Sequence, residues 1–125
     1  MIYIIDDDES VRRAFMILMQ SADFDAQSFS SPEIFFESVS LTDHDCIILD
    51  LRMNGMSGFD FLQKLSSQKT RAPVIVVSAF DDAQSRSRAH ELGAVSFFRK
   101  PVDGNALIDT IEWVIEGKKQ ASPES

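Results

Sequence analysis

Acidic residues directly follow two short apolar runs of this chain. The apolar residues 3–5 lead into Asp6 and Asp7, and the apolar residues 46–49 lead into Asp50. A continuous run of isoleucine, valine and leucine is typical of a buried parallel strand. In open α/β sheets, ligand sites form at the carboxyl ends of such strands. We therefore expect the three carboxylates to converge on one edge of a sheet.

These side chain types favour a metal-assisted phosphoryl chemistry. Closely packed carboxylates repel one another and persist together mainly where a cation neutralises them, and oxygen ligands without histidine or cysteine favour Mg²⁺. The fourth apolar run ends at Ser78, and the fifth leads to Lys100. A cation and an ammonium group balance the charge of a phosphoryl group, and a hydroxyl donates a hydrogen bond to it. A carboxylate at the centre can act as the nucleophile, because aspartate forms aspartyl-phosphate in known reactions.

The elements that position these residues alternate along the chain. We expect strands at 1–5, 25–29, 45–49, 74–77 and 95–98, and helices at 10–21, 32–40, 58–67, 82–92 and 104–116. Asp8 and Glu9 suit the start of the first helix, Ser31 and Pro32 suit the start of the second, and Gly93 suits a helix end. Strands alternating with helices predict right-handed crossovers and a parallel sheet covered on both faces.

The last two helices carry further signals. The helix at 82–92 has few apolar residues, so we expect it to be the least stable element and a candidate for movement. In the helix at 104–116, an apolar stripe faces the sheet and places Trp113 nearly opposite it. An outward tryptophan suggests a partner surface, although it is equally consistent with a ring lying on its own helix or against the tail.

The composition limits the class of protein. A chain of 125 residues with 44% hydrophobic and 26% charged residues fits one globular domain. No apolar stretch approaches the roughly 20 residues of a membrane span, and no signal peptide is evident. The single Cys46 fits a buried, inert thiol in a reducing cytoplasm. A net charge of −8 argues against nucleic acid binding by this segment itself.

Five short motifs together resemble one family. They are Ile4 to Asp7, Leu49 to Met53 with Met56 to Gly58, Val76 to Ala79, Gly93-Ala94, and Phe97 to Pro101. In this order and spacing, they resemble the receiver domain of two-component response regulators across residues 1–117. The segment from Asp50 to Gly58 is most similar to receivers of the FixJ type, which usually precede a helix-turn-helix DNA-binding domain. Residues 118–125 are then a flexible tail or the start of a linker.

The resemblance implies a fold and roles for particular residues. The fold is a doubly wound (βα)5 domain with a five-stranded parallel sheet in the flavodoxin-like order 2-1-3-4-5. Asp50 is implied as the phospho-acceptor, and the implied Mg²⁺ ligands are Asp7, Asp50, the backbone carbonyl of Arg52, and Asp6 through a water molecule. Further implied assignments are Ser78 and Lys100 as holders of the phosphoryl oxygens, Ser78 and Phe97 as switch residues, Lys100 and Pro101 as the site of a cis peptide bond, and Arg52 and Phe80 as modulators of dephosphorylation. Phe97 is also compatible with a simple core position.

Partners are implied in the same way. They include a sensor histidine kinase as phosphoryl donor and a second copy of the chain, which would bind through the face of the fourth helix, fifth strand and fifth helix with Trp113 as a candidate contact. DNA would be bound by an output domain beyond residue 125. One departure from the family is Asn54, which stands where proline is usual and should loosen the loop.

The residues alone leave other functional classes to be considered. A stand-alone phosphorelay receiver lacks the output domain, and a receiver that no longer accepts phosphate would act as a constitutive interaction module. A small Mg²⁺-dependent phosphatase would need an additional acid or base and a substrate-covering cap, for which the loops are short. A nucleotide-binding flavodoxin-like module is disfavoured, because no glycine-rich loop follows the first strand.

Overall fold

The protein folds as five βα units in chain order. The computed structural model describes residues 1–53, 55–68, 71–80 and 82–120, with the side chains of 118–120 left aside. The strands are β1 (Ile2–Ile5), β2 (Ala26–Phe29), β3 (Cys46–Asp50), β4 (Val74–Ser78) and β5 (Ser96–Arg99). The helices are α1 (Glu9–Ser21), α2 (Pro32–Ser38), α3 (Gly58–Ser66), α4 (Ala83–Glu91) and α5 (Gly104–Gln120).

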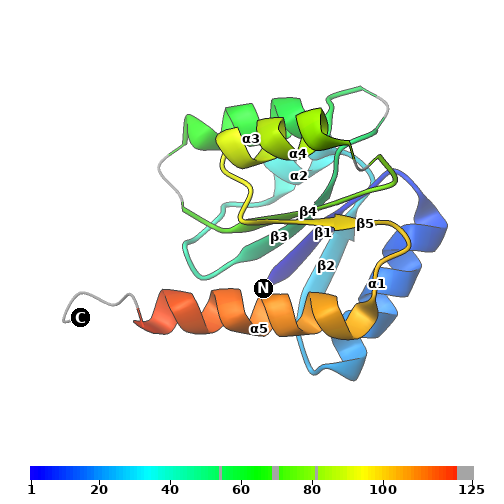
Figure 1. Ribbon diagram of the computed structural model, residues 1–125. Helices are drawn as coiled ribbons and strands as arrows, with labels where there is room; N and C mark the ends of the chain where they lie inside the picture. Colours follow the sequence, from blue (N-terminus) through cyan, green and yellow to red (C-terminus); the bar gives the residue numbers. More distant parts are fainter. Residues whose placement is uncertain (54, 69–70, 81, 121–125) are drawn as a thin grey trace.

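All four strand pairs are parallel, and the strand order is β2-β1-β3-β4-β5. The sheet lies between two helical layers, with α1 and α5 on one face and α2, α3 and α4 on the other (Figure 1). This confirms the predicted (βα)5 architecture and strand order. Because β1 and β3 are adjacent in the middle of the sheet, with Ile5 level with Leu49, the residues that follow them are brought together.

Alternate residues of the central strands supply the two cores. Ile47 and Leu49 pack toward α2 and α3, where Phe35 and Phe61 are fully buried. Cys46 and Ile48 point to the other face, toward α1 and α5. Both faces of β3 are buried along its whole length, which explains the continuous apolar run at 46–49 that precedes Asp50. Burial also raises the pKa of the Cys46 thiol to about 12, in agreement with the predicted inert cysteine.

Side chain caps begin the helices at the expected places. Asp8 accepts hydrogen bonds from the backbone N–H groups of Ser10 and Val11 at the start of α1. Ser31 caps α2, with Pro32 at the first helical position. Gly93 follows α4 with a φ of +107°, the left-handed conformation expected of a helix end.

The helix ends differ from the predictions by a few residues. Helix α2 stops at Ser38, because Val39 has an extended backbone, and α5 continues through Gln120 rather than ending at 116. Gly117 therefore lies inside a helix. The rest of the predicted tail, 121–125, lies outside the described residues.

Candidate functional site

Three aspartates meet at the carboxyl ends of β1 and β3. Asp50 is the last residue of β3, and Asp6 and Asp7 directly follow β1. One carboxylate oxygen from each lies within 4.8 Å of the other two. Asp6 and Asp50 are buried, whereas Asp7 is exposed. The convergence predicted from the sequence is therefore present, with an opening to solvent on the side of Asp7.

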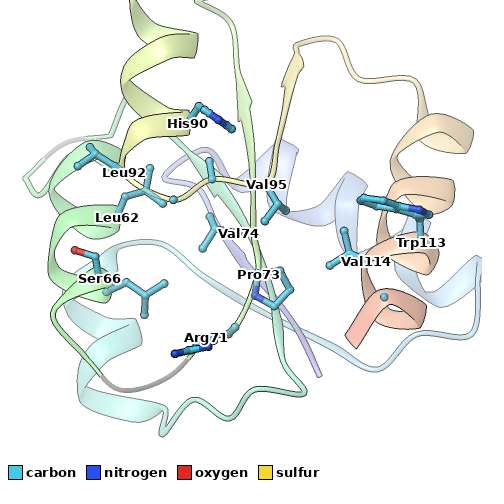
Figure 2. A pocket seen from close by; sticks show the side chains of 15 residues that line it. Leu62, Ser66, Arg71, Pro73, Val74, His90, Leu92, Val95, Trp113 and Val114 are labelled. Carbon is cyan, nitrogen blue, oxygen red and sulfur yellow. The ribbon is translucent and has the colours of Figure 1, made fainter. Parts of the chain in front are cut away.

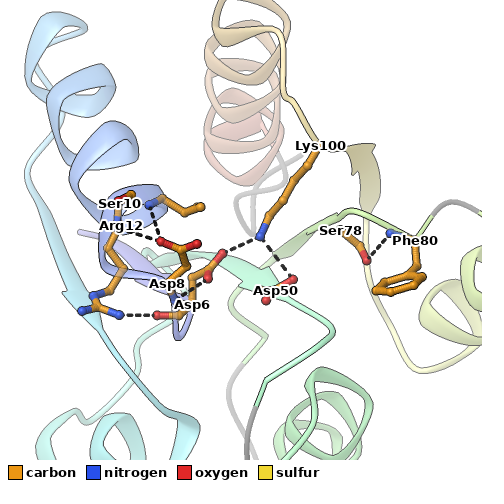
Figure 3. A network of polar contacts seen from close by, with 9 residues as sticks. Asp6, Asp8, Ser10, Arg12, Asp50, Ser78, Phe80 and Lys100 are labelled. Carbon is orange, nitrogen blue, oxygen red and sulfur yellow. Dashed lines mark hydrogen bonds and ion pairs between the residues drawn. The ribbon is translucent and has the colours of Figure 1, made fainter.

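Lys100 directly follows β5, the strand at one edge of the sheet, and its side chain reaches this cluster. Its Nζ lies 2.8 Å from Asp6 Oδ2 and 3.5 Å from Asp50 Oδ1 (Figure 3). Its backbone N–H donates to the carbonyl of Ser78 at 2.8 Å, and the Lys100–Pro101 peptide bond is cis. One ammonium group thus contacts two of the three carboxylates.

Burial and like charge act together on Asp50. Burial raises the pKa of Asp50 to about 6, the nearby Asp6 adds to the rise, and Lys100 and a backbone hydrogen bond from Arg52 reduce it. Burial lowers the pKa of Lys100, but the hydrogen bond to Asp6 and the charges of Asp50 and Asp6 outweigh it, so that this pKa lies above its usual value. Lys100 is therefore charged at neutral pH, and a second cation near the carboxylates would lower the cost of ionising Asp50.

Ser78 and Phe80 form the wall beside Asp50. Ser78 ends β4, is fully buried, and accepts a hydrogen bond from the backbone N–H of Phe80 at 3.1 Å. Phe80 is 51% exposed, and the Arg52 guanidinium carbon lies 4.3 Å from the centre of its ring. The Arg52 side chain is therefore directed toward the ring, while its backbone lies next to Asp50.

Several supporting contacts were not foreseen from the sequence. Arg12 donates to the backbone carbonyl of Asp6 at 2.8 Å, and the N–H of Asp8 donates to Asp6 Oδ1 at 2.9 Å. Both fix the orientation of Asp6. An arginine one turn into α1 carries no local signal for such a contact, because the bond depends on how the helix packs against β1.

Glycine is required at the start of α3. A Cβ atom at Gly58 would lie 2.6 Å from the carbonyl oxygen of Asp50 and 2.6 Å from the Cα of Leu51. The N–H of Gly58 donates to the carbonyl of Leu51 at 3.0 Å, which draws α3 against the end of β3. The role of Gly58 is thus a close backbone approach beside Asp50. The preceding Asn54 lies outside the described residues, while Gly55 has a φ of +79° and Glu33 accepts from the N–H of Met56 at 3.0 Å.

The donor set fits a hard divalent cation. Among the described residues, this aspartate trio is the one group of histidine, cysteine or acidic side chains arranged closely enough to hold a metal ion. All three donors are carboxylate oxygens, two of them buried, and the single ammonium group leaves the cluster with an excess of negative charge. These properties suit Mg²⁺ better than the softer transition metals.

Two aromatic residues singled out in the sequence lie away from this cluster. Phe97, on β5, is half-buried and packs against the core between the sheet and α2 to α4. Trp113 is 71% exposed, as the helical periodicity predicted. Its ring borders a groove of about 790 Å³ at the opposite end of the strands, where Val74 begins β4 and where Pro73 and Val95 directly precede β4 and β5 (Figure 2).

Together the fold and the site define a doubly wound parallel α/β protein with an acidic pocket at the carboxyl edge of its sheet. The chain matches the family model of the response regulator receiver domain over residues 2–112. It therefore belongs to that family.

Two relatives of this chain are named transcriptional regulatory proteins. The chain is 34% identical over 110 residues to the transcriptional regulatory protein TdiR of Thauera aromatica, covering 88% of this chain and 48% of TdiR. It is 31% identical over 122 residues to the transcriptional regulatory protein FixJ of Bradyrhizobium diazoefficiens, covering 98% of this chain and 58% of FixJ. The chain thus spans about half the length of these relatives.

Solved structures of response regulators have the same fold as this chain. Full-length FixJ from B. japonicum superposes with a TM-score of 0.85 at 30% identity, covering 96% of this chain and 59% of FixJ. The response regulator StyR gives a TM-score of 0.86 at 33% identity, covering 95% of this chain and 60% of StyR. None of these comparisons supports a phosphatase. Among the described residues, no helix is both long and apolar enough to cross a bilayer.

Proposed function

We propose that Asp50 accepts a phosphoryl group from the phosphohistidine of a sensor histidine kinase and that this transfer switches the domain. The proposal rests on the residues that surround Asp50. This aspartate shares a 4.8 Å cluster with Asp6 and Asp7, faces the ammonium group of Lys100 at 3.5 Å, and lies at the carboxyl edge of a parallel sheet. A nucleophile, metal-ligating carboxylates and a fixed cation are thus assembled within one pocket.

Mg²⁺ would be held by Asp7, Asp50 and the backbone carbonyl of Arg52, with Asp6 close by, and when bound it supplies positive charge for the phosphoryl oxygens. An Asp50 oxygen attacks the phosphorus in line, the new O–P bond replaces the P–N bond to the donor, and the donor imidazole leaves. Lys100 and Ser78 hold the phosphoryl oxygens, through the ammonium group and the hydroxyl respectively. In this reaction the domain assists only its own phosphorylation and dephosphorylation.

Phosphorylation would change the face formed by α4, β5 and α5. The Ser78 hydroxyl lies at the end of β4 with the N–H of Phe80 bound to it, so a move of Ser78 toward a phosphoryl group draws this loop along. Phe97 would turn inward as the loop leaves its present position. The new contacts made by the phosphoryl oxygens bias the domain toward this second arrangement. Association of two copies through the same face, with Trp113 as a contact, would follow.

The output would lie in another part of the protein. We infer that residues 1–117 form the receiver and that 118–125 lead toward a DNA-binding domain, because the chain spans about half of relatives that are named transcriptional regulators. The protein would act in the cytoplasm and regulate transcription. A stand-alone phosphorelay receiver is the alternative, and the gene sequence beyond Ser125 decides between them.

Acetyl phosphate tests the acceptor assignment. Incubated with Mg²⁺ and acetyl phosphate, the wild-type chain should gain one phosphoryl group by intact-mass spectrometry, and Asp50→Ala should gain none. Omission of Mg²⁺ or addition of EDTA should abolish the gain. Labelling of Asp50→Ala at the wild-type level would eliminate the assignment.

A further inference from the structure

Helix α4 is attached to the rest of the molecule by very little apolar packing. Ala89 is its one buried residue, and the structure describes the whole helix. Helix α3, of the same length, buries Phe61, Leu62 and Leu65. Burial of a single methyl group contributes far less than burial of three large side chains. Other contacts must therefore contribute to the position of α4.

Two arginines supply such contacts on the two flanks of the helix. The guanidinium carbon of Arg86 lies 4.7 Å from the centre of the Phe97 ring on β5. The corresponding carbon of Arg88 lies 4.4 Å from the centre of the Phe59 ring on α3. Both distances are within the roughly 6 Å of a cation–π interaction. Because residues two apart point to opposite sides of a helix, α4 is held by one aromatic ring on each side.

Phe97 has room to change its position. The ring is half-buried, and a hollow of about 220 Å³ between α4 and β5 is lined by Arg86, Ala89 and Phe97, among others. The small side chain of Ala89 leaves this space open. The ring is therefore not enclosed on the side of α4, and a ring that left its place would give up its contact with Arg86.

We propose that Arg86 is a positioning residue that holds Phe97 in its present place and thereby ties the ring to α4. The inference rests on the proposed function, in which Phe97 turns inward when Asp50 carries a phosphoryl group. The Arg86–Phe97 contact occurs in the same arrangement as the hydrogen bond that Ser78 accepts from the N–H of Phe80, which is the bond that a movement of Ser78 toward a phosphoryl group would disturb. It stabilises that arrangement, and its removal favours the phosphorylated one. Arg88 contacts a different ring and secures α4 without acting on Phe97.

Beryllofluoride mimics a phosphoryl group, so the affinity for it measures how strongly the domain favours its present arrangement over the phosphorylated one. At saturating Mg²⁺, Arg86→Gln should bind beryllofluoride roughly two- to five-fold more tightly than the wild type, which is the factor that one exposed cation–π contact represents. Arg86→Lys keeps the charge and should recover part of the wild-type affinity. Arg88→Gln is the matched control: the helix, charge change and side chain length are the same, and its affinity should stay within about 1.5-fold of the wild type.

A test of Arg86→Gln in a Phe97→Leu protein distinguishes an effect through the Phe97 ring from a general loosening of α4. In Phe97→Leu protein there is no ring to hold, so adding Arg86→Gln should change the affinity by less than about 1.5-fold. Amide exchange in α4 should rise in both Arg86→Gln and Arg88→Gln, because each variant loses a contact between α4 and an aromatic ring of a neighbouring element. If amide exchange rises in both variants but only Arg86→Gln binds beryllofluoride more tightly, Arg86 is a positioning residue for Phe97.

Three results would overturn the inference. They are wild-type affinity in Arg86→Gln, equal gains in Arg86→Gln and Arg88→Gln, and an undiminished effect of Arg86→Gln in Phe97→Leu. If the wild type neither binds beryllofluoride nor is labelled at Asp50, the proposed function fails and the inference fails with it. If the wild type does both and Arg86→Gln is unchanged, the inference alone fails.

Discussion

At Asp50, burial and a neighbouring carboxylate both oppose ionisation of the side chain. Its pKa is raised to about 6, so the folded protein binds this proton more tightly than the unfolded chain does. The associated stability is fully present below about pH 4 and is lost as the pH rises through about 6. At neutral pH without a divalent cation, the ionised Asp50 therefore destabilises the fold.

Asp50→Asn should consequently raise the free energy of unfolding at about pH 7.5 in EDTA, by roughly 1–3 kcal/mol. The gain should vanish near pH 4, where Asp50 is already protonated. Urea denaturation at the two pH values provides the measurement, with Asp109→Asn on the exposed side of α5 as the control that should change little. A less stable Asp50→Asn protein at about pH 7.5 would contradict this account of the pocket.

At the residue scale, sequence reasoning found the parts of the site that end strands and missed the parts that depend on packing. Asp6, Asp7 and Asp50 were predictable because the ends of neighbouring parallel strands meet. The hydrogen bond from Arg12 to the backbone of Asp6 and the stacking of Arg52 on Phe80 were not predictable. These long side chains reach partners set by the relative placement of two elements, which leaves no periodic pattern in the sequence.

At the scale of the elements, the start of α3 depends on Gly58, because only a residue without a Cβ atom fits there. Gly58→Ala would bring a Cβ to 2.6 Å from backbone atoms of Asp50 and Leu51, which cannot rotate away. We expect a loss of roughly 2–3 kcal/mol in the free energy of unfolding, together with weaker Mg²⁺ binding as Asp50 shifts. Chemical denaturation and Mg²⁺ titration by calorimetry measure both effects.

Gly117→Ala is the matched control for this substitution. Gly117 lies within α5, and a Cβ there would meet no heavy atom within 4 Å. The change should stabilise the protein by roughly 0.5–1 kcal/mol, since alanine favours a helix interior. If Gly58→Ala proved as stable as Gly117→Ala, the close approach of α3 to β3 would be wrong.

The order and type of most elements were predictable because apolar runs alternate with segments of helical periodicity, whereas β2 and α4 contain few apolar residues and carry the weakest pattern. The ends of helices were less predictable. The last helix was expected to end at 116, yet α5 includes Gly117 and runs through Gln120. A single glycine costs a helix only about 1 kcal/mol, which the neighbouring hydrogen bonds offset. Helix α2 likewise ends before the predicted residue 40, because Val39 adopts an extended backbone.

At the scale of the whole molecule, the exposed Trp113 bears on association. If phosphorylation reshapes the face of α4, β5 and α5, sedimentation velocity should show a monomer with Mg²⁺ alone and a dimer once beryllofluoride is added. Trp113→Ala should weaken the dimer by about ten-fold or more, as expected for a central aromatic contact. A monomer in both states would reject association through this face.

The central claim is that distant parts of the chain meet so that one particular carboxylate becomes phosphorylated. Borohydride reduction of the phosphorylated protein converts an acyl phosphate to the corresponding alcohol, and peptide mass spectrometry then locates it. The account predicts homoserine at position 50 alone, formed only when Mg²⁺ was present. Reduction at Asp6, Asp7 or another acidic residue, or none at all after Mg²⁺ and acetyl phosphate, would contradict it.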